Sequence, residues 1–174
     1  MIVIVGAILV VVIGVLALAA MKPDTLTMAR TMDIKARPER IFPLLNDLRR
    51  WVEWPADDEQ AKASRTFGPI SSGKGATSEW VGSGSAGSGR MEITDSVAPS
   101  RVIVAVDFRK PFVAHNINEF SLEGRGDSTR VTWLWRGQNV YVLKLMSVFL
   151  NPEKMMGSHF ESGLRALKTR AESG

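Results

Sequence analysis

The segment from Met1 to Met21 constrains the fold most, because no residue in it carries a charged side chain. It consists of Val, Ile, Leu and Ala, with Gly6 and Gly14 between them. About 20 helical residues at 1.5 Å each cover the roughly 30 Å hydrocarbon core of a bilayer. In lipid the backbone must form its hydrogen bonds within its own segment, so the β-branched residues do not argue against a helix. The sequence therefore predicts one N-terminal transmembrane helix at 1–21, followed by a linker at 22–26.

A cleaved signal peptide is the alternative, with Ala17-Leu18-Ala19 as its cleavage site. A signal peptide has a basic start and an apolar stretch of about 7–15 residues. This start has no Lys or Arg and its apolar run is longer, which favours a retained anchor. The positive-inside rule then predicts a single-pass membrane protein whose following domain lies on the cytoplasmic side. The basic residues behind this orientation are Lys22, Arg30, Lys35, Arg37 and Arg40.

Composition limits the chemistry of the remaining chain, which has room for one folded domain at 27–174. With 45% apolar and 23% charged residues, the 174-residue chain is typical of a packed globule. A net charge of +4 is too small to indicate binding to nucleic acid. The chain has no Cys and two His, which excludes disulfides, thiolate nucleophiles and Cys- or His-rich metal sites. We therefore expect no metal and no cofactor.

Period-two alternation predicts a sheet. The segment from Leu26 to Ile34 alternates apolar and polar residues, as a half-buried strand does. Pro38-Glu39 is typical of a helix start, and Pro43 is expected to shorten or kink that helix. Short apolar segments bounded by Gly, Pro, Ser and Asp follow, which predicts an antiparallel meander. These segments are 63–67, 75–81, 90–97, 102–108, 113–122 and 129–136.

The C-terminal part changes to helical spacing. We interpret Val140–Leu150 as a core helix, with a helix that touches lipid beside the anchor, or gates a cavity, as the alternative. Asn151-Pro152-Glu153 then supplies an N-terminal cap, a first-turn Pro and an early acid for a long amphipathic helix. The prediction is an α+β fold, in which a curved antiparallel sheet wraps around this last helix.

Several stretches match one family in order and character. The longest runs from Ile34 to Leu48 and on through Trp51-Val52-Glu53-Trp54; the others are Gly73–Ala76 before Trp80, Gly89–Ile93, Pro99–Val102 and Thr129–Trp133. Together they resemble the START/Bet v 1-like (SRPBCC) superfamily, and within it the polyketide cyclase/dehydrase-type proteins. The resemblance covers nearly the whole chain from Thr27 onward. Its motifs mark structural positions, and no catalytic motif of the family is present to carry over.

The resemblance implies a helix-grip fold with a hydrophobic cavity between the sheet and the long helix. It implies an apolar small molecule or lipid as partner and leaves protein partners open. Plain core packing is the alternative role for the Trp residues. We expect the cavity to be lined by Trp80, Phe108, Asn118, Phe120, Trp133, Trp135, Met156 and Phe160.

Two other functions remain open at this point. One is a cyclase- or dehydratase-like enzyme in which His159, Asn118 or Glu119 polarises the substrate; the sequence assigns no catalytic residue. The other is a non-catalytic interaction module at the membrane, with a filled core and no cavity. On the strand at 113–122, Asn118 is expected on the concave face with Phe120, while His115 and Glu119 face solvent.

Two short motifs are interpreted as turns. Gly82–Gly87 matches the Gly-x-Gly-x-x-Gly dinucleotide fingerprint, but an alternating strand follows it where the fingerprint requires a helix. Arg125-Gly126-Asp127-Ser128 spells an integrin-recognition motif, yet Gly and Asp are also what a tight turn between strands needs. We therefore reject both functional interpretations.

Overall fold

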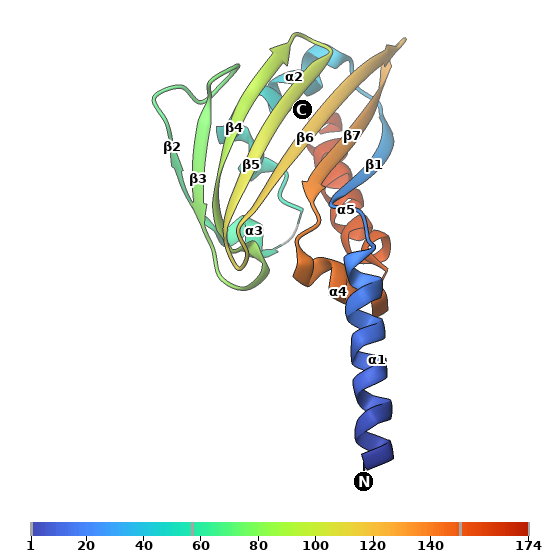
Figure 1. Cartoon of the computed structure of the whole chain (residues 1–174). Helices are drawn as coiled ribbons and strands as arrows, with labels where there is room; N and C mark the ends of the chain where they lie inside the picture. The colour runs from blue at the N-terminus through green and yellow to red at the C-terminus, as the bar shows by residue number, and fades with distance from the viewer. Residues whose placement is uncertain (1, 57, 150, 174) are drawn as a thin grey trace.

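The computed structural model describes residues 2–56, 58–149 and 151–173, and it shows one sheet gripping one long helix (Figure 1). All seven strands are antiparallel, in the order β1-β7-β6-β5-β4-β3-β2. The predicted α+β class, curved antiparallel sheet and long C-terminal helix are confirmed. The strands are β1 (Thr25–Ile34), β2 (Ser64–Phe67), β3 (Thr77–Val81), β4 (Ser88–Val97), β5 (Arg101–Lys110), β6 (Ala114–Arg125) and β7 (Ser128–Gln138).

The helices occupy the ends of the chain and the connection between β1 and β2. β1 starts at Thr25, inside the stretch predicted as linker. The helices are α1 (Ile2–Ala20), α2 (Pro38–Asn46), α3 (Asp58–Lys62), α4 (Tyr141–Phe149) and α5 (Pro152–Glu172), with 3₁₀ turns η1 (Leu48–Glu53) and η2 (Gly84–Ala86).

The meander forms because each strand alternates and each turn has suitable residues. In the β6–β7 hairpin Arg125 pairs with Ser128, and Gly126 between them takes a φ of 64°. Glycine is the residue that adopts such an angle without strain, so the Arg-Gly-Asp-Ser stretch is a two-residue turn. The Gly82–Gly87 stretch connects strands β3 and β4. Both turn interpretations are confirmed.

The core lies between the concave face of the sheet and the helices α2 and α5. α5 packs against β1 and α2. The sheet and both helices contribute fully buried side chains, among them Ile34 of β1, Leu45 of α2 and Leu164 of α5. Burying such a side chain contributes about 1.5–3 kcal/mol, so this contact holds α5 in the grip.

α2 ends early and places two tryptophans. The helix contains Pro43 and stops at Asn46, as expected, and the Asp47 carboxylate then accepts a hydrogen bond from Arg49 N at 2.9 Å. η1 follows directly. The indole nitrogens of Trp51 and Trp54 donate back to carbonyls of α2, at 2.9 and 3.1 Å. These bonds hold both rings against the concave face.

α4 corrects one interpretation: the segment predicted as a core helix lies on the surface. Lys144 is its buried residue, whereas Tyr141, Val142 and Phe149 are exposed. α4 packs along α1, where the Tyr141 hydroxyl donates to Leu16 O at 3.3 Å and the Lys144 ammonium binds the Asp24 carboxylate. Apolar content alone does not tell a helix facing the core from one facing another helix.

α1 extends away from the grip domain, with its N-terminus at the far end of the molecule (Figure 1). Its side chains are described from Ile4 onward, and the large apolar ones are exposed, for example Ile8 and Val10. Over the described residues, no helix of the chain is long and apolar enough to cross a membrane. The anchor at 1–21 stays a prediction.

Candidate functional site

The candidate site is the concave face of the sheet where α5 crosses it. Side chains alternate along β6 and β7, so every second residue faces α5. All eight residues predicted to line a cavity are buried or half-buried. They come from β3, β5, β6, β7 and α5.

Most of the predicted aromatic residues form one continuous group. Trp133 lies between Phe120, at 4.9 Å between ring centroids, and Phe160 of α5, at 4.7 Å. Phe160 also approaches Trp135 at 6.3 Å. Trp51 and Trp54 of η1 extend the group, because each meets Phe120 edge-on. These two Trp are not among the eight residues predicted to line the cavity.

Three glycines allow the tryptophans to lie flat against the backbone. A Cβ at Gly163 of α5 would lie 2.9 Å from the Trp133 ring, and one at Gly137 would lie 2.3 Å from the Trp135 ring. A Cβ at Gly89 would lie 2.4 Å from the Trp80 ring. Optimal carbon–carbon contacts are about 3.5–4.0 Å, so none of these positions has room for a larger residue. This pattern depends on the three-dimensional register and has no signal in the sequence.

Trp80 and Phe108 form a second group. Their rings meet edge-on at 5.2 Å, and the Trp80 indole donates to Ala86 O at 2.8 Å. Among the described residues no ring contact joins this pair to the Trp133 group. The predicted aromatic residues therefore belong to two neighbourhoods of one face.

The two buried amides of β6 differ in their bonding. Asn118 accepts a hydrogen bond from the Trp133 indole nitrogen at 2.8 Å, which fixes that ring. Asn116 is 7% exposed, and its side chain makes no hydrogen bond within the described part of the chain. The Asn116 amide is not among the fully covered polar groups, so it keeps some contact with solvent and is the amide available to a bound molecule.

The residues considered for acid–base chemistry are not brought together. His159 lies at 3.3 Å from Gln60, measured between their Nε2 atoms, beside Phe160. Glu119 faces outward towards Arg136, and His115 meets Asp107 at 2.5 Å on the same outer face. The described residues contain no group of three or more acidic, His or Cys side chains that could hold a metal.

An ion-pair clamp joins η1 to the end of α5. Glu53 of η1 binds Arg50 at 3.0 Å and Arg170 of α5 at 2.5 Å. The hydrogen bond from Arg50, with a further one from Arg170, holds the pKa of Glu53 below its usual value against the effect of burial. The clamp ties the segment carrying Trp51 and Trp54 to the end of α5.

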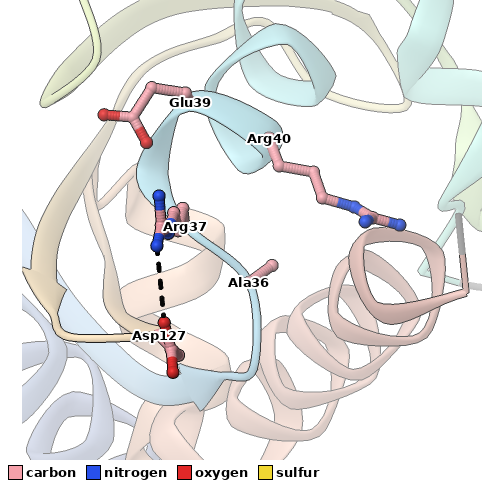
Figure 2. A pocket seen from close by; sticks show the side chains of 5 residues that line it. All are labelled: Ala36, Arg37, Glu39, Arg40 and Asp127. Atoms are coloured by element: carbon pink, nitrogen blue, oxygen red, sulfur yellow. Dashed lines mark ion pairs between the residues drawn. The ribbon is translucent and has the colours of Figure 1, made fainter.

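Two surface hollows lie away from the eight predicted residues. One, of about 610 Å³, lies where α2 begins and has Arg37, Glu39 and Asp127 on its walls (Figure 2). Arg37 and Asp127 pair at 3.6 Å, but both are largely exposed, so the pair contributes little. The other, of about 640 Å³, lies between the β3–β4 loop and Lys110-Pro111. Neither has the enclosed apolar walls of a small-molecule site.

The sheet order, the enclosed α5 and the aromatic concave face together define a helix-grip protein of the START/Bet v 1-like superfamily. Solved structures share this fold. CV1439 from Chromobacterium violaceum is 15% identical with a TM-score of 0.61, over 87% of this chain and 99% of that one. Mll3558 from Rhizobium loti is 19% identical with a TM-score of 0.60, over 83% and 96%.

A third similar structure, jhp0584 from Helicobacter pylori, is 10% identical with a TM-score of 0.63, over 84% of this chain and 88% of that one. At these identities the likeness establishes the fold alone. The family follows from the sequence: the chain belongs to the family described as polyketide cyclase / dehydrase and lipid transport, whose model matches residues 25–172. No curated protein matches the sequence closely enough to count as a relative.

Proposed function

We propose that this protein binds an apolar small molecule or lipid between the concave face of the sheet and α5. The observation that carries the proposal is the aromatic face itself, with Trp133, Trp135 and Phe160 facing one another across the grip beside the unbonded amide of Asn116. An apolar lining with one or two polar groups is the usual composition of a small-molecule site. The description of the family, which includes lipid transport, supports the same class of ligand.

Opening the grip is energetically feasible. Phe160 packs on Trp133 and Trp135. Each such ring pair contributes about 0.5–1.5 kcal/mol beyond the area that it buries. A bound alkyl chain returns about 0.8 kcal/mol for each methylene taken out of water. A chain of a few methylenes therefore offsets the loss of both ring contacts.

Tryptophan quenching tests the proposal. All five Trp lie between Trp51 and Trp135, so fluorescence reports on the grip domain and not on α1. The full chain, held in lipid nanodiscs, is titrated with 9,10-dibromostearic acid and with the corresponding alcohol. We expect saturable quenching by at least one probe, reversed by the same molecule without bromine. Quenching that stays linear with probe concentration, and is not reversed by the unbrominated molecule, would show that the grip stays closed.

We further propose that α1 holds the domain at a membrane, with the grip on the cytoplasmic side. The uncharged run in the sequence extends from Met1 to Met21, and the large side chains described for α1 expose apolar surface to the surroundings. Lys22 and Arg30 follow the run closely. Exposed apolar surface of this extent indicates an interaction with lipid or protein.

Membrane association and sidedness have separate tests. The full chain is expected to remain with membranes after alkaline carbonate extraction, and the double variant Leu9→Lys, Ile13→Lys to be released. Because the chain has no Cys, a single Ser173→Cys variant reports the side of the membrane through an impermeant maleimide. Labelling only after cells are permeabilised supports the cytoplasmic side, and labelling of intact cells contradicts it.

A non-catalytic interaction module at the membrane is the second candidate. The observation that favours it is the close packing of the rings. The Trp133 ring centroid lies 4.9 Å from that of Phe120 and 4.7 Å from that of Phe160. A filled core of this kind needs no ligand. The module predicts no saturable quenching by either brominated probe, so one titration separates the two functions.

A further inference from the structure

Arg65 of β2 is a half-buried cation to which the described residues supply no partner. Its Nε and Nη1 atoms are fully covered, and neither has a hydrogen-bond partner within the described part of the chain. A covered guanidinium nitrogen that donates to nothing costs free energy, because it has given up its hydrogen bonds to water. The protein keeps Arg65 at this cost.

The strand register places Arg65 on the concave face. Arg65 pairs directly with Trp80 of β3, whose side chain belongs to the core. Paired residues on neighbouring strands point to the same side of a sheet, so Arg65 faces the grip. Ser78 lies two positions before Trp80 in β3 and therefore on the same face. It is 1% exposed, and its hydroxyl also lacks a partner among the described residues.

Other arginines of the sheet form ion pairs with carboxylates, which sets Arg65 apart. Arg101 binds Asp95 at 2.7 Å, and Arg109 and Arg130 bind carboxylates at 3.1 and 2.9 Å. For Arg65, burial lowers the pKa, and no carboxylate offsets this effect. Among the described residues no carboxylate pairs with Arg65.

An apolar path leads from this position into the grip. In the register, Ser78 lies opposite Met91, Met91 opposite Val106, and Val106 opposite Asn116. Met91 and Val106 are buried members of the core. One transverse row of the sheet therefore joins the unpaired hydroxyl of Ser78 to the unbonded amide of Asn116 through apolar side chains.

We propose that Arg65 and Ser78 bind the carboxylate of a long-chain acid whose alkyl chain lies along this row. The inference rests on the proposed function and specifies its ligand class as acidic amphiphiles. A guanidinium presents donors in a planar fork that matches the two oxygens of a carboxylate, and the Ser78 hydroxyl adds a further donor. The headgroup thereby satisfies the buried donors, and the chain occupies the apolar face.

The test compares one alkyl chain with two headgroups. The full chain in nanodiscs is titrated with 9,10-dibromostearic acid, at a pH where the acid is ionised, and with 9,10-dibromooctadecanol. The wild type is expected to bind the acid at least tenfold more tightly than the alcohol. Arg65→Met is expected to abolish this preference and to leave the alcohol affinity within about twofold, because charged hydrogen bonds contribute about tenfold or more.

Matched variants separate headgroup binding from other roles. Arg65→Lys keeps the charge without the fork and is expected to retain part of the preference. Ser78→Ala is expected to reduce it, since one donor is lost. The control is Arg90→Met, which removes an exposed cation of β4 that pairs with Glu92. It is expected to change neither affinity.

The outcomes distinguish this inference from the proposed function. If neither probe quenches, the proposed function fails. If both bind equally and Arg65→Met alters neither, only the acid-binding site is refuted. β2 is an edge strand, and inward-pointing charges on edge strands also prevent sheets from pairing with other molecules. A variant that self-associates more strongly, with its acid preference intact, would assign Arg65 that protective role and overturn the proposal.

Discussion

The contact of α5 with Trp133 predicts opposite effects for two glycine-to-alanine changes in one helix. At Gly163 the new Cβ would lie 2.9 Å from Trp133 Cζ3, within the packed ring group. At Gly157 the nearest atom is Nη2 of Arg30, the end of a flexible side chain, at 2.6 Å. Both changes gain about 1 kcal/mol of helix propensity. The structure therefore isolates the packing contribution.

The size of each stability change depends on whether the atom that the new Cβ meets can move away. At Gly163 the ring must shift by roughly 0.6 Å or more to restore a normal carbon contact. Overpacking of this kind costs about 1–3 kcal/mol, so the expected net loss for Gly163→Ala is about 1 kcal/mol. At Gly157 the end of the Arg30 side chain must move, which loosens its ion pair with Glu161 at a cost under about 1 kcal/mol, so Gly157→Ala is neutral or mildly stabilising.

Urea denaturation of the full chain in detergent, followed by Trp fluorescence, measures both effects. For an m-value of about 1–3 kcal/mol/M, a difference of about 1–2 kcal/mol between the two variants separates their midpoints by roughly 0.3–2 M. Adding Trp133→Phe should shrink the cost of Gly163→Ala, because the double-mutant cycle removes the ring that clashes. Equal midpoints for the two alanine variants would refute the reasoning, since α5 would then not be held tightly against the sheet.

Three further predictions address single contacts. Asn118→Leu leaves the buried Trp133 indole N–H unpaired and should lower the free energy of unfolding by about 1–3 kcal/mol, measured by urea denaturation, whereas an unchanged midpoint would contradict the bond. The folded-state pKa of Glu53 is lowered, so its contribution to stability is present above the unfolded pKa of about 4.3 and is lost as pH falls through the lowered folded-state pKa. In Glu53→Gln the urea midpoint should depend less on pH in that window than in the wild type. Asp24→Ala removes the carboxylate that binds buried Lys144 and should speed tryptic cleavage at α4, and an unaltered cleavage rate would show that α4 is held without it.

The succession of strands along the chain could be predicted from the sequence because each strand carries its own signal. β1 and β7 alternate in burial along their length, and Gly126 marks a turn at the residue where a positive φ is needed. The inward direction of Trp133 and Trp135 followed from the same alternation, and their burial confirms it. Local periodicity was sufficient for these features.

Features that depend on distant parts of the chain could not be predicted in this way. The segment predicted as a core helix was misassigned because α4 packs along α1 and not into the core, and both partners produce the same apolar pattern. Arg65 has an ordinary place in an alternating strand, and its missing partner becomes evident only when the register sets it opposite Trp80. The role of Gly163 likewise depends on the approach of α5 to β7.

The central claim is that the grip holds an apolar ligand, and native mass spectrometry of the full chain tests it most directly. The protein is purified in a mild detergent from the cells that make it, and the detergent is removed in the gas phase. We expect a second species heavier by one apolar molecule, and we expect Arg65→Met to lose it if that molecule is an acid. A single mass equal to that of the chain, unchanged after incubation with long-chain acids and alcohols, would contradict the claim.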